Sequence, residues 1–151
     1  MQVESATQAL PSAAGAQQSY VVAGAIISCS CGTQLTRLKV PVSHGVYIRK
    51  LPQLNINDYQ PGIHIMNFGN CTNQRNPAVK NGSVDTNGVQ KAPCVPVITA
   101  PWINGKEDVL VEGQPAMLNV CTNRCVYAGS LIKVEDDGQN LGGVSVGGGG
   151  S

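Results

Sequence analysis

Short apolar runs separated by turn residues dominate the hydrophobic pattern of this chain. Residues 20–29 are rich in Val and Ile, and residues 45–50 alternate apolar and polar side chains directly after the turn residues Ser43 and Gly45. Short runs of this kind, bounded by Gly, Pro, Asn or Ser, are typical of β-strands. The pattern therefore predicts a strand in each of these segments.

A β-hairpin is predicted further along the chain. Two short apolar runs, residues 108–111 and 116–120, flank a Glu-Gly-Gln-Pro turn at residues 112–115. Gly and Pro are common turn residues because Gly adopts positive φ angles and Pro fixes φ near the value that a turn needs. Residues 126–136 are expected to hold the last strand, which we expect to stop at the acidic turn 135–138.

No segment shows a sustained helical period. The one candidate, residues 76–90, is interrupted by Gly82 and Gly88, so at best it holds a single turn. With 18 Gly and 9 Pro in 151 residues, the chain is punctuated throughout. We therefore expect an all-β fold of short strands joined by many turns.

Both ends of the sequence differ from this middle part. Residues 1–19 are polar and rich in Ala, Gln and Ser, so they are expected to form an arm that orders only against a partner. Residues 140–151 read as a Gly-rich tail or linker, which leaves a domain at 20–139. The start shows no export signal, and the longest apolar stretch is too short to span a bilayer. The chain is accordingly expected to be made in a reducing cytosol.

Composition adds two expectations. Hydrophobic residues reach 42% but aromatic residues only 4%, so the core is predicted to be thin and to need a staple. Trp102 is expected to be the largest core or interface residue. Charged residues make up 13% and the net charge is +1, which provides no basic stripe for a phosphate backbone, so no nucleic-acid partner is expected.

The cysteines and histidines carry the candidate chemistry. The cysteines stand at positions 29, 31, 71, 94, 121 and 125, and the histidines at 44 and 64. Four of the cysteines (31, 71, 94 and 125) lie beside Gly, Pro or Asn or within two residues of one, so turns could bring them to one point, where a structural zinc ion would replace missing core. Buried free thiols and disulfides remain the alternatives at this level, because the spacing lacks the paired pattern of a zinc finger.

The chain resembles the PAAR-like spike-tip family, in the branch first catalogued as a domain of unknown function. The similarity runs through five ordered segments, whose most specific part is the fourth. These segments are an opening strand and cysteine (20–32), a Pro-Ser-His turn (40–48), a Phe-Gly-x-Cys and Asn-Pro block (65–79), the long stretch 92–119, and a closing cysteine and strand (125–139).

The resemblance implies a small cone of short strands and turns, stapled by a metal, that caps and sharpens the trimeric needle of a contractile injection system. Type VI secretion systems, phage-tail-like particles and extracellular injection systems use such tips for membrane puncture and effector delivery. Carried over by position, the family's metal ligands fall on Cys29, Cys71, Cys94 and Cys125, with His44 as the likeliest substitute and zinc as the structural ion.

The same resemblance implies the partners and the location. The expected partner is the trimeric, VgrG-like spike protein of the baseplate, with non-covalent effector cargo and a transient contact with the target-cell membrane as further possibilities. The protein would be made in the bacterial cytoplasm, assembled on the machine and delivered outside with the spike. No enzyme activity is expected. The competing interpretations are a stand-alone metal-binding β-module and, with less support, a cysteine-dependent hydrolase effector.

Overall fold

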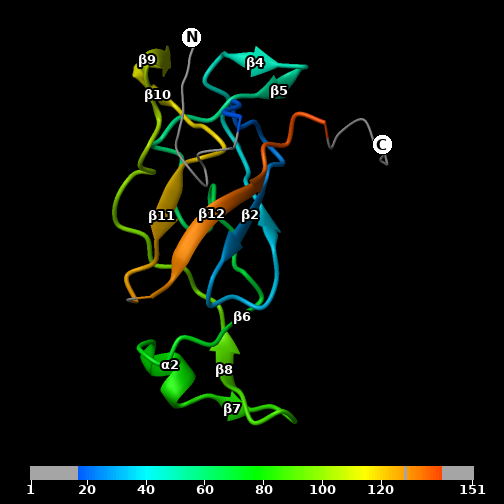
Figure 1. Cartoon of the computed structure of the whole chain (residues 1–151), viewed down its shortest axis with the longest axis vertical. Helices are drawn as coiled ribbons and strands as arrows, with labels where there is room; N and C mark the ends of the chain where they lie inside the picture. The colour runs from blue at the N-terminus through cyan, green and yellow to red at the C-terminus, as the bar shows by residue number, and fades with distance from the viewer. Residues whose placement is uncertain (1–16, 128, 141–151) are drawn as a thin grey trace.

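A four-stranded antiparallel sheet forms the middle of the molecule in the computed structural model, which describes residues 17–127 and 129–140 (Figure 1). Its order is β11–β12–β2–β3. The strands are β2 (Ile26–Cys29), β3 (Thr36–Arg37), β11 (Thr122–Arg124) and β12 (Leu131–Asp136). Ile132 lies opposite Cys29 and Val134 opposite Ile27. An early strand and a late strand therefore form the centre of the sheet.

Two β-hairpins lie together at one end of the long axis (Figure 1). They are β4 (Tyr47–Ile48) with β5 (Leu51–Pro52), and β9 (Lys106–Val111) with β10 (Gln114–Ala116). Each turns through two residues with positive φ: Arg49 (52°) and Lys50 (68°) in the first, Glu112 (50°) and Gly113 (83°) in the second. Two consecutive positive φ angles are typical of the type I′ turn, whose twist matches that of the flanking strands.

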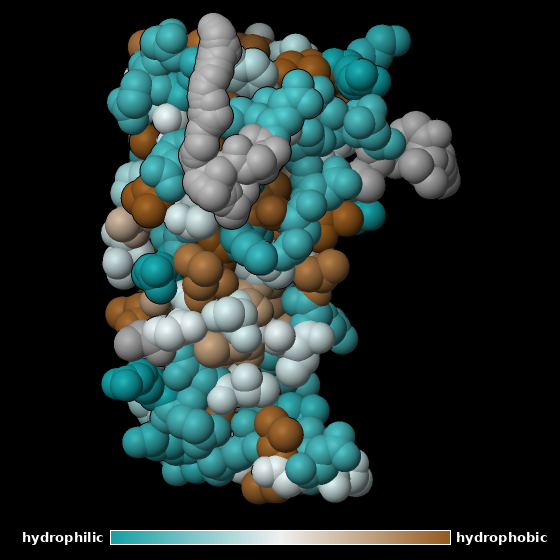
Figure 2. Space-filling model, viewed as in Figure 1, coloured by the Kyte–Doolittle hydropathy of each residue, from teal (hydrophilic) through white to brown (hydrophobic). Residues whose placement is uncertain are grey.

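The opposite end carries a small three-stranded sheet and a helix (Figure 1). Its strands, in the order β6–β8–β7, are β6 (Asn70–Cys71), β8 (Gln90–Pro93) and β7 (Ser83–Val84), and the helix is α2 (Pro77–Lys80). The Asn76 side chain caps α2 by accepting a 3.0 Å hydrogen bond from the Ala78 N–H. On the face shown in Figure 2, hydrophilic residues cover most of this end, whereas apolar residues gather over the middle of the molecule.

One connected hydrophobic core runs through the described chain. Trp102 and Phe68 are its largest members, and each exposes 1% of its surface. Aliphatic side chains from the sheet and loops surround them, among them Ile27, Leu38, Leu54, Ile65, Met117 and Ile132. None of the helices among the described residues is long and apolar enough to cross a membrane.

The structure confirms mostly β architecture with one helical turn in the described chain, and it corrects two boundaries. The strand expected at 116–120 is β10 at Gln114–Ala116, because the two-residue turn ends at Gly113 and pairing starts at once. The last strand was expected at 126–136, and β12 ends as expected at Asp136 but begins only at Leu131, because the chain turns before it and the Ser130 N–H donates a 3.2 Å bond to the Tyr127 carbonyl. The arm and tail predicted at the two ends lie largely outside the described residues.

Candidate metal centre

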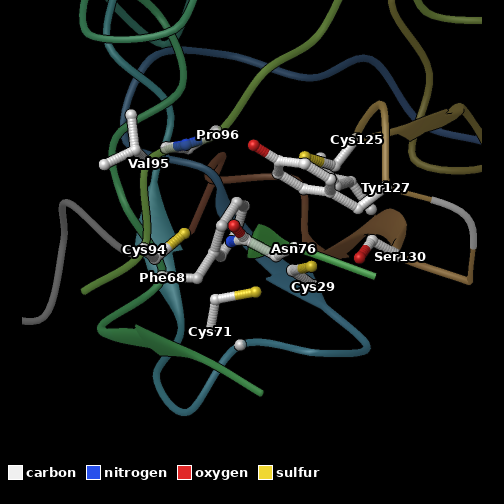
Figure 3. A pocket seen from close by; sticks show the side chains of 12 residues that line it. Cys29, Phe68, Cys71, Asn76, Cys94, Val95, Pro96, Cys125, Tyr127 and Ser130 are labelled. Atoms are coloured by element: carbon white, nitrogen blue, oxygen red, sulfur yellow. The ribbon is translucent and has the colours of Figure 1, made fainter. Parts of the chain in front are cut away.

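Four of the six cysteines line one small pocket where the central sheet meets the β6–β8–β7 sheet (Figure 3). Cys29 ends β2 and Cys71 ends β6, whereas Cys94 directly follows β8 and Cys125 directly follows β11. These are the four positions that the resemblance implies as metal ligands. The cavity measures about 10 Å³, which is at the lower end of the roughly 10–15 Å³ that a cavity needs to admit one water molecule. The pocket thus has room for one small species.

Close backbone packing brings the first cysteine to this pocket. The chain turns sharply after Cys29, whose carbonyl accepts a 3.0 Å hydrogen bond from the Gly32 N–H. A Cβ atom on Gly32 would lie 2.5 Å from the Cβ of Phe68, so only glycine allows this approach. The neighbouring Gly69 carbonyl accepts a 2.9 Å bond from the Cys94 N–H. Segments distant in sequence are therefore fixed around the same point.

Each of the four sulfurs accepts a backbone N–H. The Asn73 N–H donates to the Cys71 sulfur at 3.5 Å, and the Val97 N–H donates to the Cys125 sulfur at 3.3 Å. Backbone hydrogen bonds from residues 31 and 68 reach the sulfurs of Cys29 and Cys94 and act to lower their pKa values. Hydrogen bonds to the charged form favour it, so these backbone groups would stabilise a thiolate at Cys29 and at Cys94.

Burial and the neighbouring thiols oppose the formation of thiolates in this pocket. Burial, the largest cause, raises the pKa of both Cys29 and Cys94 above the ordinary thiol value, and the neighbouring thiols raise both further. Four thiolates in one place repel each other unless a cation joins them. The surroundings therefore oppose thiolates without a cation, whereas the backbone N–H groups favour them once the charge is compensated.

The remaining cysteines and the histidines lie outside this pocket. Cys121 is fully buried, and burial raises its pKa to about 11, although its sulfur accepts a 3.3 Å bond from the Leu118 N–H. Cys31 is half-buried, and its sulfur contacts the Gly129 carbonyl at 3.8 Å. His44 and His64 both pair with Asp58 instead of lining the pocket. His44 is therefore not placed as a substitute ligand.

Sequence reasoning missed the rest of the lining. Phe68 and Ile132 form apolar walls, and Asn76 and Ser130 add polar atoms. Ser130 accepts a 2.7 Å hydrogen bond from the side-chain amide of Asn73, which joins β6 to the loop before β12. The Asn-Pro pair at 76–77 is an available signal, because an asparagine before proline is a typical helix N-cap.

The donor set fits a structural zinc ion. Zinc in such sites binds four thiolates or imidazoles as a tetrahedron, with Zn–S distances of about 2.3 Å. No group of three or more His, Cys, Asp or Glu side chains in the described part of the chain is arranged to hold an ion as it stands. A bound ion would be held by the sulfurs of Cys29, Cys71, Cys94 and Cys125, with no ligand needed from outside the chain.

Replacing Gly32 with alanine should destabilise the pocket. The added Cβ would force the turn after Cys29 away from Phe68, at a cost of about 1–3 kcal/mol. Chemical denaturation measures the loss of stability, and a zinc assay on the same sample measures whether the expected ion is lost with it. Gly88→Ala is the control, since Gly88 lies in the β7–β8 turn and an added Cβ meets no atom within 4 Å. Its positive φ makes that variant strained too, but its zinc content should be unchanged. Wild-type stability and zinc content in Gly32→Ala would contradict the close approach.

Comparison with known proteins places this pocket within a family. No curated protein and no solved structure matches the chain. A family match covers residues 21–139 and so includes all four pocket cysteines, the central sheet and both hairpins. The chain belongs to the family described as "Domain of unknown function (DUF4280)".

Proposed function

We propose that this chain is the PAAR-like tip of a contractile injection system, a structural protein that caps and sharpens a trimeric spike. A zinc ion held by Cys29, Cys71, Cys94 and Cys125 would staple the cone. The protein would be carried out of the bacterial cell on the spike, touch the target membrane transiently and act without catalysis.

The convergence of four cysteines on one pocket carries the proposal. They come from four strand ends in two sheets, and each sulfur accepts a backbone N–H. Buried thiols that merely fill space have no need to gather at one point. The thin aromatic core supports the same interpretation, because a small domain with few large side chains gains most from a metal.

A puncturing tip has to resist force, and forced unfolding is governed by the rate of unfolding. The pocket joins β2 and β11 of the central sheet to β6 and β8 at one end of the molecule. Pulling that end away would have to separate the four cysteines. A bound zinc ion supplies strong, short bonds to each sulfur at this junction.

The end with the two hairpins is the proposed docking surface for the needle. Tyr47 in β4 and Leu110 in β9 expose 54% and 59% of their surfaces. Apolar side chains exposed beside strand edges suit a partner that also ends in strands, because pairing covers edges that would otherwise aggregate. This end lies opposite the α2 and β7 end, which would then point forward (Figure 1).

The two alternatives make different demands. A stand-alone metal-binding β-module would keep the zinc but would not bind a spike. A cysteine-dependent hydrolase needs an imidazole within reach of the thiol. Both histidines of the chain pair with Asp58, and neither lines the cysteine pocket, which weighs against the hydrolase.

Two measurements on the purified protein test the proposal. Elemental analysis should find about one zinc per chain, and thiol counting should show four cysteines that react only after chelation. Mixing with the trimeric spike protein from the same gene cluster should give a complex of one chain per trimer in native mass spectrometry. Zinc without a complex would favour the stand-alone module. A complex without zinc would remove the staple and leave the capping role.

A further inference from the structure

Both histidines of the chain meet at one buried carboxylate, away from the cysteine pocket. The His44 Nε2 lies 2.8 Å from one oxygen of Asp58, and the His64 Nε2 lies 3.3 Å from the other. The second ring nitrogen of His44, Nδ1, lies 2.5 Å from a carboxylate oxygen of Glu112. His44 therefore bridges two carboxylates that are far apart in sequence.

The protons in this cluster follow from its geometry. Carboxylate oxygens accept hydrogen bonds, so His44 can donate to Asp58 and Glu112 at the same time only when both of its ring nitrogens carry a proton. The His64 Nδ1 accepts a 3.3 Å bond from the Gln60 N–H, which leaves its Nε2 to face Asp58 at 3.3 Å.

The two ends of the bridge differ in rigidity. The Asp58 side chain exposes 4% of its surface, and the oxygen that faces His44, Oδ2, also accepts a 2.9 Å bond from the Asn55 N–H. The carbonyl of Asp58 also accepts a 3.0 Å bond from the Trp102 indole N–H. The Glu112 side chain is 65% exposed and sits at the tip of the β9–β10 hairpin. Asp58 is a fixed anchor, whereas Glu112 is held at this point by His44.

The backbone at Glu112 supports a specific role for that contact. Glu112 has φ = 50° at the first position of the β9–β10 turn, where Asn, Asp or Gly is the usual residue because a larger side chain strains the backbone. Strain of this kind persists only where the surroundings hold it. The described contact that distinguishes this glutamate from an ordinary turn residue is its bond to His44.

We propose that His44 is a proton-operated clasp between the β9–β10 turn and the loop that follows β5. With two protons it holds the β9–β10 turn, through Glu112, to the anchor at Asp58. When His44 loses a proton, the remaining one stays with the buried Asp58, and Glu112 then faces a lone pair instead of a donor. The hairpin turn is released. The clasp stands on these contacts alone, whether or not the chain caps a spike.

The direction of the pH dependence follows from the charges that face His44. Burial lowers the pKa of His44, but the bonds to Glu112 and Asp58 outweigh it and leave the pKa above the ordinary 6.5. A raised pKa means that the clasp stabilises the fold fully below pH 6.5 and is lost as pH rises through the folded-state pKa. Burial, with the neighbouring His44 charge, lowers the pKa of His64, and that contribution is lost as pH falls.

Nuclear magnetic resonance titration of the imidazole nitrogens tests the first half of the proposal. In the full-length protein, His44 should titrate above pH 6.5, and in Glu112→Gln its midpoint should fall by about one unit, as removal of a charge within ~4 Å predicts. Asp108→Asn is the matched control. It removes one exposed carboxylate from the same hairpin, where Asp108 pairs with Lys106, and should leave the His44 midpoint unchanged.

Hydrogen exchange tests the second half. Protection of amides 110–114, relative to amides 131–134 of β12 in the same sample, should drop as pH passes the His44 midpoint. Glu112→Gln should show the low value throughout, and Asp108→Asn should follow wild type. A His44 midpoint at or below 6.5, or relative protection that does not change across it, would overturn the clasp. Imidazole signals that shift on chelation would identify a bound ion and also overturn it.

Discussion

Serine in place of Cys94 should leave the chain largely unfolded at room temperature. Cys94 is buried, lines the pocket and links the end of β8 to the Gly69 carbonyl. Apparent binding energies of structural zinc sites reach about 10–16 kcal/mol, whereas a typical domain has a total stability of about 5–15 kcal/mol. If the proposed zinc site forms, losing one ligand removes most of what keeps the native state populated. Circular dichroism with zinc analysis measures the outcome.

The chain offers its own control for this experiment. Cys31→Ser makes the same substitution two residues after Cys29, at a half-buried position outside the pocket lining. It should keep both zinc and a wild-type melting curve. Chelation of the wild type should reproduce the Cys94→Ser spectrum. Without a metal, serine at a buried cysteine costs only about 1–2 kcal/mol, so a folded Cys94→Ser protein with modestly reduced stability would exclude the staple.

Alanine in place of Trp102 should destabilise the fold by about 3–5 kcal/mol, the usual cost of truncating a fully buried aromatic side chain. Trp102 exposes 1% of its surface, and its backbone N–H donates a 3.0 Å bond to the Ile56 carbonyl. The indole N–H also supports the Asp58 loop. Urea denaturation followed by far-ultraviolet circular dichroism gives the free energy of unfolding.

Two further variants separate the contributions of Trp102. Trp102→Phe keeps most of the apolar area and loses the hydrogen bond to Asp58, so it should cost about 1–3 kcal/mol. Val42→Ala truncates a side chain that is 80% exposed and should change stability by less than about 0.5 kcal/mol. If Trp102→Ala lowered the free energy of unfolding no more than Val42→Ala, the described packing of the core around Trp102 would be wrong.

The strands that could be predicted from the sequence are those with a recognisable run of apolar side chains. The hairpin at 108–120 was recognisable because its apolar runs flank Gly113 and Pro115. β11, in contrast, reads Thr-Asn-Arg and has no apolar alternation, so its pairing with β12 depends on the tertiary fold. β7 and β8 could not be predicted either, because they too lack apolar alternation. Both residues of β7 are exposed, and Gly82 lets the chain pass close to the Lys91 carbonyl.

The candidate site was only partly visible in the sequence. Turn residues beside the cysteines suggested convergence, and the resemblance implied Cys29, Cys71, Cys94 and Cys125 over the other two, but spacing alone could not rank them. Cys121 differs in being fully buried and in lying outside the pocket lining, which sequence spacing does not reveal. The His44 contact with Glu112 joins residues 68 apart, and no local pattern marks it.

The pairing of β2 with β12 also affects how the chain can fold while it is being synthesised. Ser28 in β2 donates a hydrogen bond to Glu135 in β12, across 107 residues of sequence. On the ribosome, β2 must wait with one edge open until nearly the whole domain has been translated. Folds that depend on such distant pairings form slowly, and an unpaired strand edge invites aggregation in the meantime. We therefore expect the nascent chain to need a chaperone until β12 emerges.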